Sequence, residues 1–130
     1  MKVAAVVVSH GHPAELAESL PALEPQVDEL VVIANIPGSV PEGVEAVHNE
    51  RPLGFGANIN QGARRTTAEL VLSANPDAVP EPGAVDTLRR FMEEGGCFIC
   101  GGDCGGANPP IVSCPMQQAR KALGGTNAPE

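Results

Sequence analysis

The chain has 130 residues, of which 42% are hydrophobic, and this size fits one small domain. Sixteen acidic residues against eight basic ones give a formal net charge of −8, which argues against duplex nucleic acid as a partner. There is no Trp or Tyr and there are only three Phe, so recognition by aromatic stacking is disfavoured. No apolar run reaches the about 18 residues that a membrane-spanning helix needs. The short apolar start lacks a signal-peptide cleavage site, so the sequence predicts a cytoplasmic protein.

The first two expected elements are a strand and a helix. Residues 2–8 form a valine-rich run that is typical of a strand covered on both faces. Leucines at helical spacing follow, and they predict a helix that begins near Pro13 and is limited at its far end by Pro21. These leucines are Leu16, Leu20 and Leu23.

Three further strands and one helix are expected in the middle of the chain. Residues 29–34 repeat the buried-strand pattern, and after a loop rich in Pro and Gly, residues 44–47 predict a short third strand. Residues 54–67 are interpreted as a loop entering a helix, which Gly62 is expected to weaken. Residues 70–73 predict the fourth strand.

The last expected helix has the clearest signals. Glu81 and Pro82 stand at its start, and Gly95 and Gly96 end it. Its apolar face is formed by Val85, Leu88, Phe91 and Met92. Strands that alternate with helices imply parallel β-α-β units, so we predict an α/β fold with an open, mostly parallel sheet flanked by helices.

The composition changes after Gly96, and we therefore expect an α/β domain over residues 1–96 and a separate tail over residues 97–130. All four cysteines lie in the tail, with the spacing Cys97-x2-Cys100-x3-Cys104-x9-Cys114. The first pair has the spacing of zinc ligands, and four thiolates would complete a structural site. The other spacings match no standard zinc site, so ordinary free cysteines remain the alternative.

Candidate site residues follow from the expected sheet. Ligands bind beyond the carboxyl ends of parallel strands where the strand order reverses, and a central first strand would bring two loops to that place. These loops contain Ser9-His10-Gly11 and Asn75-Pro76-Asp77. The carboxylate of Asp77 would suit Mg²⁺ or Mn²⁺, with phosphate oxygens as further ligands. A plain turn is the alternative that this composition alone favours.

Other polar residues of the first domain give weaker indications. Asn58 and Asn60 stand at a helix entry, where they would either cap the helix or donate to a ligand, and capping is favoured. Residues 54–56 do not make a dinucleotide-binding motif, because the third glycine is missing and the stretch follows the third strand. A surface role is favoured for the three histidines, because no set of metal ligands is complete around them; they are His10, His12 and His48.

Three stretches of the chain carry a resemblance to a known family. They are residues 6–10 (VVVSH), residues 49–62 (NERPLGFGANINQG) and residues 72–77 (LSANPD). Together they resemble the amino-terminal part of the family 2 glycosyltransferases of the GT-A fold, especially the rhamnosyltransferase-like branch. The middle stretch is the most specific, because its Leu-Gly-Phe-Gly-Ala-Asn-x-Asn order is distinctive within that branch. The resemblance covers about residues 2–96.

The resemblance implies a function for residues 1–96. This part would bind a nucleotide-sugar donor, and an acidic motif after the fourth strand would hold a divalent metal on the diphosphate. The sugar would be transferred with inversion to a hydroxyl group of a glycan or lipid-linked acceptor. Asp77 is the implied metal ligand. The implied substrate-binding residues are Ser9, His10, Gly11, Asn35, Asn58, Asn60 and Asn75.

The chain departs from the family pattern at two places. After the second strand the family has an Asp-Asn pair whose acid contacts the nucleotide, whereas this chain has Ala34-Asn35. The family also continues for about a hundred or more residues, which takes it beyond the usual size of one small domain. That continuation supplies the catalytic base and the acceptor site, and residues 97–130 do not resemble it. We therefore expect a truncation or a reading-frame change near Gly96.

Two alternative functions stay open at this point. One is a truncated, non-catalytic remnant that still binds nucleotides. The other is a small zinc-binding protein built on the tail cysteines. The sequence names neither a catalytic base nor an oligomeric state.

Overall fold

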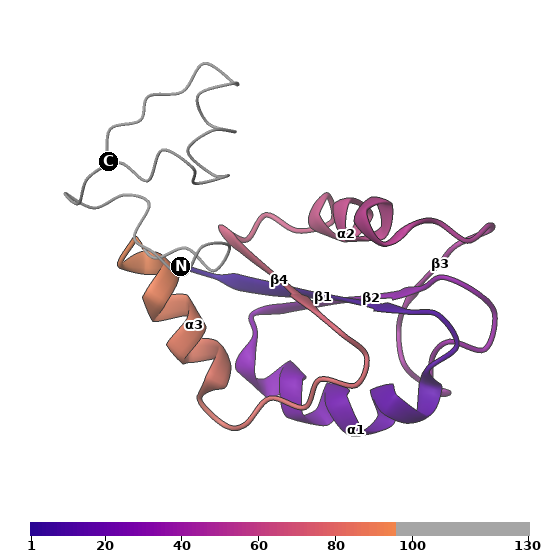
Figure 1. Ribbon diagram of the computed structural model, residues 1–130, viewed down its shortest axis with the longest axis horizontal. Helices are drawn as coiled ribbons and strands as arrows, with labels where there is room; N and C mark the ends of the chain where they lie inside the picture. The colour runs from indigo at the N-terminus through magenta and orange to yellow at the C-terminus, as the bar shows by residue number, and fades with distance from the viewer. Residues whose placement is uncertain (96–130) are drawn as a thin grey trace, which may run out of the picture. The chain divides into compact units, whose positions relative to one another are not determined.

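The computed structural model describes residues 1–95 (Figure 1). The chain divides into two compact units, Met1–Asp86 and Thr87–Glu130, and the whole β-sheet belongs to the first. The predicted boundary at residue 96 stays a prediction. The elements in chain order are β1 (Val3–Ser9), α1 (Pro13–Leu23), the 3-10 turn η1 (Glu24–Gln26), β2 (Glu29–Ala34), β3 (Val47–His48), α2 (Phe55–Ala63), β4 (Leu70–Ala74) and α3 (Ala84–Glu93).

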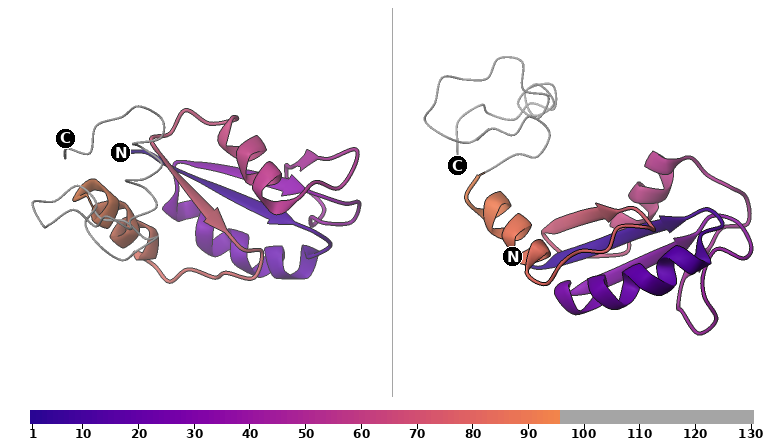
Figure 2. Two further views of the ribbon diagram at one scale, coloured as in Figure 1. Left: turned by 45° about the horizontal axis from the view of Figure 1, so that its top comes forward. Right: turned by 60° about the horizontal axis from the view of Figure 1, so that its bottom comes forward.

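The sheet has four strands in the order β3-β2-β1-β4, and every pair is parallel. The predicted α/β class with a parallel sheet and flanking helices is therefore confirmed. β1 is central: Val7 pairs with Val32 of β2 on one side and with Ala74 of β4 on the other. The helices α1 and α2 cover opposite faces of this sheet (Figure 1 and Figure 2).

The buried β1 explains why its sequence is apolar without alternation. Residues 3–7 of the strand are all buried, as expected for a strand with a helix on each face. Side chains alternate between the faces, so Val3, Ala5 and Val7 pack in the core on the side of α1. The helix contributes the predicted leucines to this core: Leu16, Leu20 and Leu23.

On the opposite face, α2 lies close to β1 at Gly62. A Cβ atom at this position would lie 2.4 Å from Cγ1 and 2.8 Å from Cγ2 of Val6, which is completely buried. The sequence predicted Gly62 only as a weak point of the helix. The structure shows that its missing side chain is what allows the helix to approach the strand.

Two sequence predictions about element ends are corrected. β3 has only two residues, Val47 and His48, and not residues 44–47, because Val44 and Ala46 pack against the core without pairing to β2. Pro21 lies inside α1 and does not end it. The buried Leu20 and Leu23 on either side of Pro21 hold the helix against the sheet to its last residue, although a proline removes one helical hydrogen bond.

The start of α3 is tied to the end of α1 by the side chain of Gln26. Its Oε1 accepts a hydrogen bond from the Val85 N–H at 3.2 Å, and its Nε2 donates to the carbonyls of Ala22 and Glu81 at 2.9 and 3.0 Å. Val85 is buried in the core. Of the predicted apolar face, Met92 is 39% exposed. The predicted glycine stop is confirmed, because Gly95 follows the helix with a φ of 89°.

A carboxylate fastens the amino ends of β1 and β4. Glu69 accepts a hydrogen bond from the Lys2 N–H at 2.8 Å. Hydrogen bonds from its own N–H and from that of Lys2 hold the pKa of this carboxyl below its ordinary value. A carboxyl whose pKa is lowered by folding stabilises the fold above its ordinary pKa, and this stabilisation is lost as the pH falls through the folded pKa. We expect Glu69→Gln to be slightly less stable than wild type near neutral pH and equally stable in strong acid. Urea unfolding at several pH values measures this, and a stability difference independent of pH would contradict it.

Candidate functional site

The strand order reverses between β1 and β4, and β1 has the central position on which the sequence-based prediction depends. The chain passes from β1 outward to β2 and β3, and then returns across the sheet to place β4 on the other side of β1. Loops that follow such a pair of strands diverge and leave a crevice at their carboxyl ends. Because Val7 pairs with Ala74, the loop that begins at Asn75 starts beside the end of β1. The two loops selected from the sequence are therefore neighbours.

The loop after β1 is held by two buried serines. The Ser9 hydroxyl donates to the Ser39 carbonyl at 2.6 Å and accepts from the His12 N–H at 3.1 Å. The Ser39 hydroxyl accepts from the Gly11 N–H at 3.0 Å and donates to the Ile36 carbonyl at 2.6 Å. Both hydroxyls are thus used inside the protein. Gly11 has a φ of 81°, a conformation that favours glycine.

Beside this turn lies a cluster of side-chain amides formed by Asn35, Asn49, Asn58 and Gln61, which we call the amide cluster. Asn35, at the end of β2, is only 6% exposed. Its Oδ1 accepts from the Leu53 N–H at 2.8 Å and from Asn49 Nδ2 at 2.9 Å. Its Nδ2 donates to the Leu53 carbonyl at 3.0 Å and lies 3.0 Å from Nδ1 of His10. The cluster therefore connects the turn after β1, through His10, to the loop before α2, through Leu53.

Asn58 is completely buried in the same cluster. Its Oδ1 accepts from Asn49 Nδ2 at 2.8 Å and from Gln61 Nε2 at 3.4 Å, and its Nδ2 lies 3.3 Å from the Leu53 carbonyl. The favoured capping role was wrong, because Gly54 is the N-cap of α2 and no side chain caps this helix. Asn60 is exposed on the same helix.

The loop after β4 is a turn with an exposed acid. The Ala78 N–H donates to the Asn75 carbonyl at 3.0 Å and closes the turn, so the geometry of the plain-turn interpretation is correct. Asn75 and Asp77 are both exposed. Within residues 1–95, no hydrogen bond holds the Asp77 carboxylate. An exposed carboxylate in such a turn remains available to a cation.

Comparison with known proteins decides the family. Residues 6–120 match the family model described as "Glycosyl transferase family 2". The chain belongs to this family. No curated protein and no solved structure matches it. The family match runs past Gly96 and thus further along the chain than the motif resemblance, and the parallel α/β sheet agrees with a GT-A-like fold.

The candidate residues of this family 2 domain fall into two groups, according to whether they are buried or exposed. The side chains of Ser9, Asn35 and Asn58 are buried and bonded within the protein. The exposed candidates are His10, Gly11, Asn60, Asn75 and Asp77. Sequence reasoning did not single out Ser39, Asn49 or Gln61. Asn49 and Gln61 lie in the family-like stretch 49–62, whereas no pattern marks Ser39 in its Pro- and Gly-rich loop.

The candidate residues at the carboxyl ends of β1 and β4 include few groups that could bind a metal. Residues 1–95 contain no group of three or more His, Cys, Asp or Glu side chains that could hold a metal ion. Mg²⁺ commonly binds through one or two carboxylates together with substrate phosphates, and Asp77 fits that pattern as a single ligand. The four cysteines considered as zinc ligands lie outside the described residues; they are Cys97, Cys100, Cys104 and Cys114.

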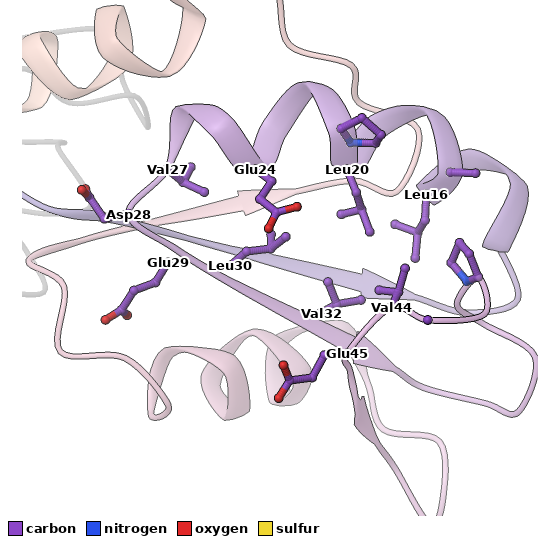
Figure 3. Close-up of a pocket in the computed structure, with 14 residues that line it drawn as sticks. Leu16, Leu20, Glu24, Val27, Asp28, Glu29, Leu30, Val32, Val44 and Glu45 are labelled. Carbon is purple, nitrogen blue, oxygen red and sulfur yellow. The ribbon is translucent and has the colours of Figure 1, made fainter.

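The domain also has a cavity away from this site. It measures about 780 Å³ and lies between α1, β2 and the loop around Val44 (Figure 3). Its rim carries four acids, of which Asp28 accepts from the Val3 N–H and Glu29 from Thr66. These two carboxylates are therefore engaged in holding the fold.

None of the helices in residues 1–95 is long and apolar enough to cross a bilayer.

Proposed function

We propose that this domain binds a nucleoside-diphosphate sugar and Mg²⁺ or Mn²⁺ at the carboxyl ends of β1 and β4, and that it transfers the sugar to a hydroxyl acceptor with inversion. The observation that carries the proposal is the reversal of strand order between β1 and β4 in a family 2 glycosyltransferase domain. It brings the turn after β1 and the exposed Asp77 to the same edge of the sheet. The acceptor is a glycan or a lipid-linked hydroxyl.

The residues of this edge take different roles in the proposal. Asp77 would hold the cation, whose charge would neutralise the diphosphate as it departs. His10, Asn60 and Asn75 offer exposed polar groups to the donor, while the buried Ser9 fixes the turn that carries His10. A rhamnosyltransferase-like specificity and a cytoplasmic location complete the proposal. The proposed rhamnosyltransferase-like specificity is based on the resemblance of residues 49–62 to that branch. No residue is assigned as the catalytic base.

Calorimetric titration with UDP and dTDP, with and without Mn²⁺, tests this proposal. We expect metal-dependent binding by the wild type. We expect Asp77→Ala to weaken it by at least about tenfold, as for the loss of a charged contact worth about 1.5 kcal/mol or more. Glu81→Ala is the matched control, because it removes another exposed acid from the same connection between β4 and α3. Its affinity is expected to equal that of the wild type.

Two outcomes would count against the proposal. If the wild type binds neither nucleotide, the proposed donor site is wrong. If Asp77→Ala binds as tightly as the wild type, Asp77 is not part of the site. Transfer from a labelled nucleotide-sugar then separates an active enzyme from a domain that binds without turnover.

A further inference from the structure

The orientation of the Asn35 amide is determined by a group that can only donate. The Leu53 N–H lies 2.8 Å from one end of this amide, so that end must be the oxygen Oδ1. The opposite end is then the amide nitrogen Nδ2, with two hydrogens to place. One of them is directed to the Leu53 carbonyl at 3.0 Å. The other is left for Nδ1 of His10, also at 3.0 Å.

This arrangement determines the protonation of His10. A hydrogen bond from Asn35 Nδ2 requires a lone pair on His10 Nδ1, so this nitrogen carries no proton. The ring is therefore neutral, with its proton on Nε2. His10 also contacts His12, whose Nδ1 accepts from the His10 backbone N–H at 3.3 Å. This contact requires that Nδ1 of His12 carries no proton. It involves the backbone of His10 and leaves both nitrogens of the His10 ring free of His12.

We infer that Asn35 is a positioning residue, which holds the His10 ring as the Nε2–H tautomer so that this N–H donates a hydrogen bond to the nucleotide. The ligand part of the inference rests on the proposed function. His10 is exposed, and its Nδ1 is directed to Asn35, so Nε2–H is the polar group that the ring offers to a ligand. Nucleotide phosphates and sugars present acceptor oxygens at such an edge.

The same contacts make Asn35 a link between two parts of the site. It bonds the His10 ring from the turn after β1 and both backbone groups of Leu53 from the loop before α2. A shift of the amide would displace both. Asn35 itself is buried, so it acts through His10 and Leu53 and does not touch the ligand.

Nuclear magnetic resonance on the ligand-free protein tests the tautomer directly. The chain has three histidines, and long-range ¹H–¹⁵N spectra distinguish the two neutral tautomers and the cation. We expect His10 of the wild type to carry its proton on Nε2. This measurement needs no variant, so it remains decisive even if substitutions at position 35 impair folding. His10 as the Nδ1–H tautomer or as the cation at neutral pH would overturn the inference.

Asn35→Asp is the most informative variant. Asp keeps an acceptor for the Leu53 N–H and for Asn49, and the Leu53 carbonyl keeps its contact with Asn58. It replaces the donor that faces His10 Nδ1 by an acceptor, so we expect His10 to gain a proton on Nδ1. The ring of His48, which lies on β3 outside the cluster, should keep its wild-type spectrum. An unchanged His10 spectrum in Asn35→Asp would contradict the positioning role.

Binding of UDP in the presence of Mn²⁺ tests the ligand contact. We expect His10→Ala to weaken binding by about tenfold, as for one hydrogen bond to a charged group. His48→Gln is the control and should bind like the wild type. If His10→Ala binds normally while Asp77→Ala does not, the donor site is right and the role of His10 is wrong. If the wild type binds no nucleotide, the proposed function fails, and the spectra alone decide whether Asn35 fixes His10.

Discussion

Gly62→Ala is expected to destabilise the domain by about 3 kcal/mol, the upper part of the usual range for an extra methyl group in a packed core. The new Cβ would lie 2.4 Å from Cγ1 of Val6, well inside van der Waals contact. Val6 cannot move away, because it is completely buried in the central strand and its strand pairs on both sides. The strain must therefore push α2 off the sheet. Thermal and urea unfolding measure the effect.

Gly56→Ala is a control on the same helix. A Cβ at Gly56 meets nothing within 4 Å, so only helix propensity acts, and the variant should be stabilised by about 0.5–1 kcal/mol. The double variant Gly62→Ala/Val6→Ala should be more stable than the sum of its single effects predicts, because the second change removes the clashing atoms. Equal stabilities of Gly62→Ala and Gly56→Ala would show that α2 does not approach β1 at this point.

Asn58→Ala is expected to destabilise the domain by about 2 kcal/mol, which is typical when a buried hydrogen-bonding partner is removed. Asn58 is completely buried and contacts Asn49, Gln61 and Leu53. Its loss removes the acceptor of one Asn49 hydrogen and of one Gln61 hydrogen, at a position that is itself completely buried. Chemical unfolding, monitored by far-ultraviolet circular dichroism because the chain has no Trp, measures the difference.

Asn60→Ala separates this effect from a general effect of asparagine in α2. Asn60 lies on the same helix two residues later and is exposed. Its replacement should change the stability by less than about 0.5 kcal/mol. If Asn58→Ala and Asn60→Ala have the same stability, the amide cluster contributes nothing measurable to the fold.

Local patterns in the sequence predicted the features that depend on neighbours along the chain. The valine-rich run of β1, the leucines of α1 and the glycine after α3 each have a periodicity or a backbone preference that acts within a few residues. The adjacent loops at the carboxyl edge follow from the central position of β1, which is a rule of parallel sheets. These features determine most of the strands and helices of the described residues and the order in which they follow one another.

The inner structure of the site depends on contacts between distant residues. Ser9 bonds to Ser39 across 30 positions, and Asn35 contacts His10 across 25. Spacing cannot reveal which hydroxyl or amide will be buried, so the sequence offers Ser9, Asn35 and Asn58 as substrate-binding residues although their side chains bond within the protein. The short β3 was mispredicted for a similar reason. Val44 has a strand-like side chain, but it packs against the core without pairing.

The two serine hydroxyls have a consequence for the thermodynamics of ligand binding. They accept hydrogen bonds from the backbone N–H groups of Gly11 and His12, so the turn after β1 is already hydrogen-bonded without a ligand. A segment that is ordered in advance loses little conformational entropy when a ligand arrives. In the site proposed above, the ordering cost of binding would therefore fall mainly on the exposed side chains, namely His10, Asn60, Asn75 and Asp77.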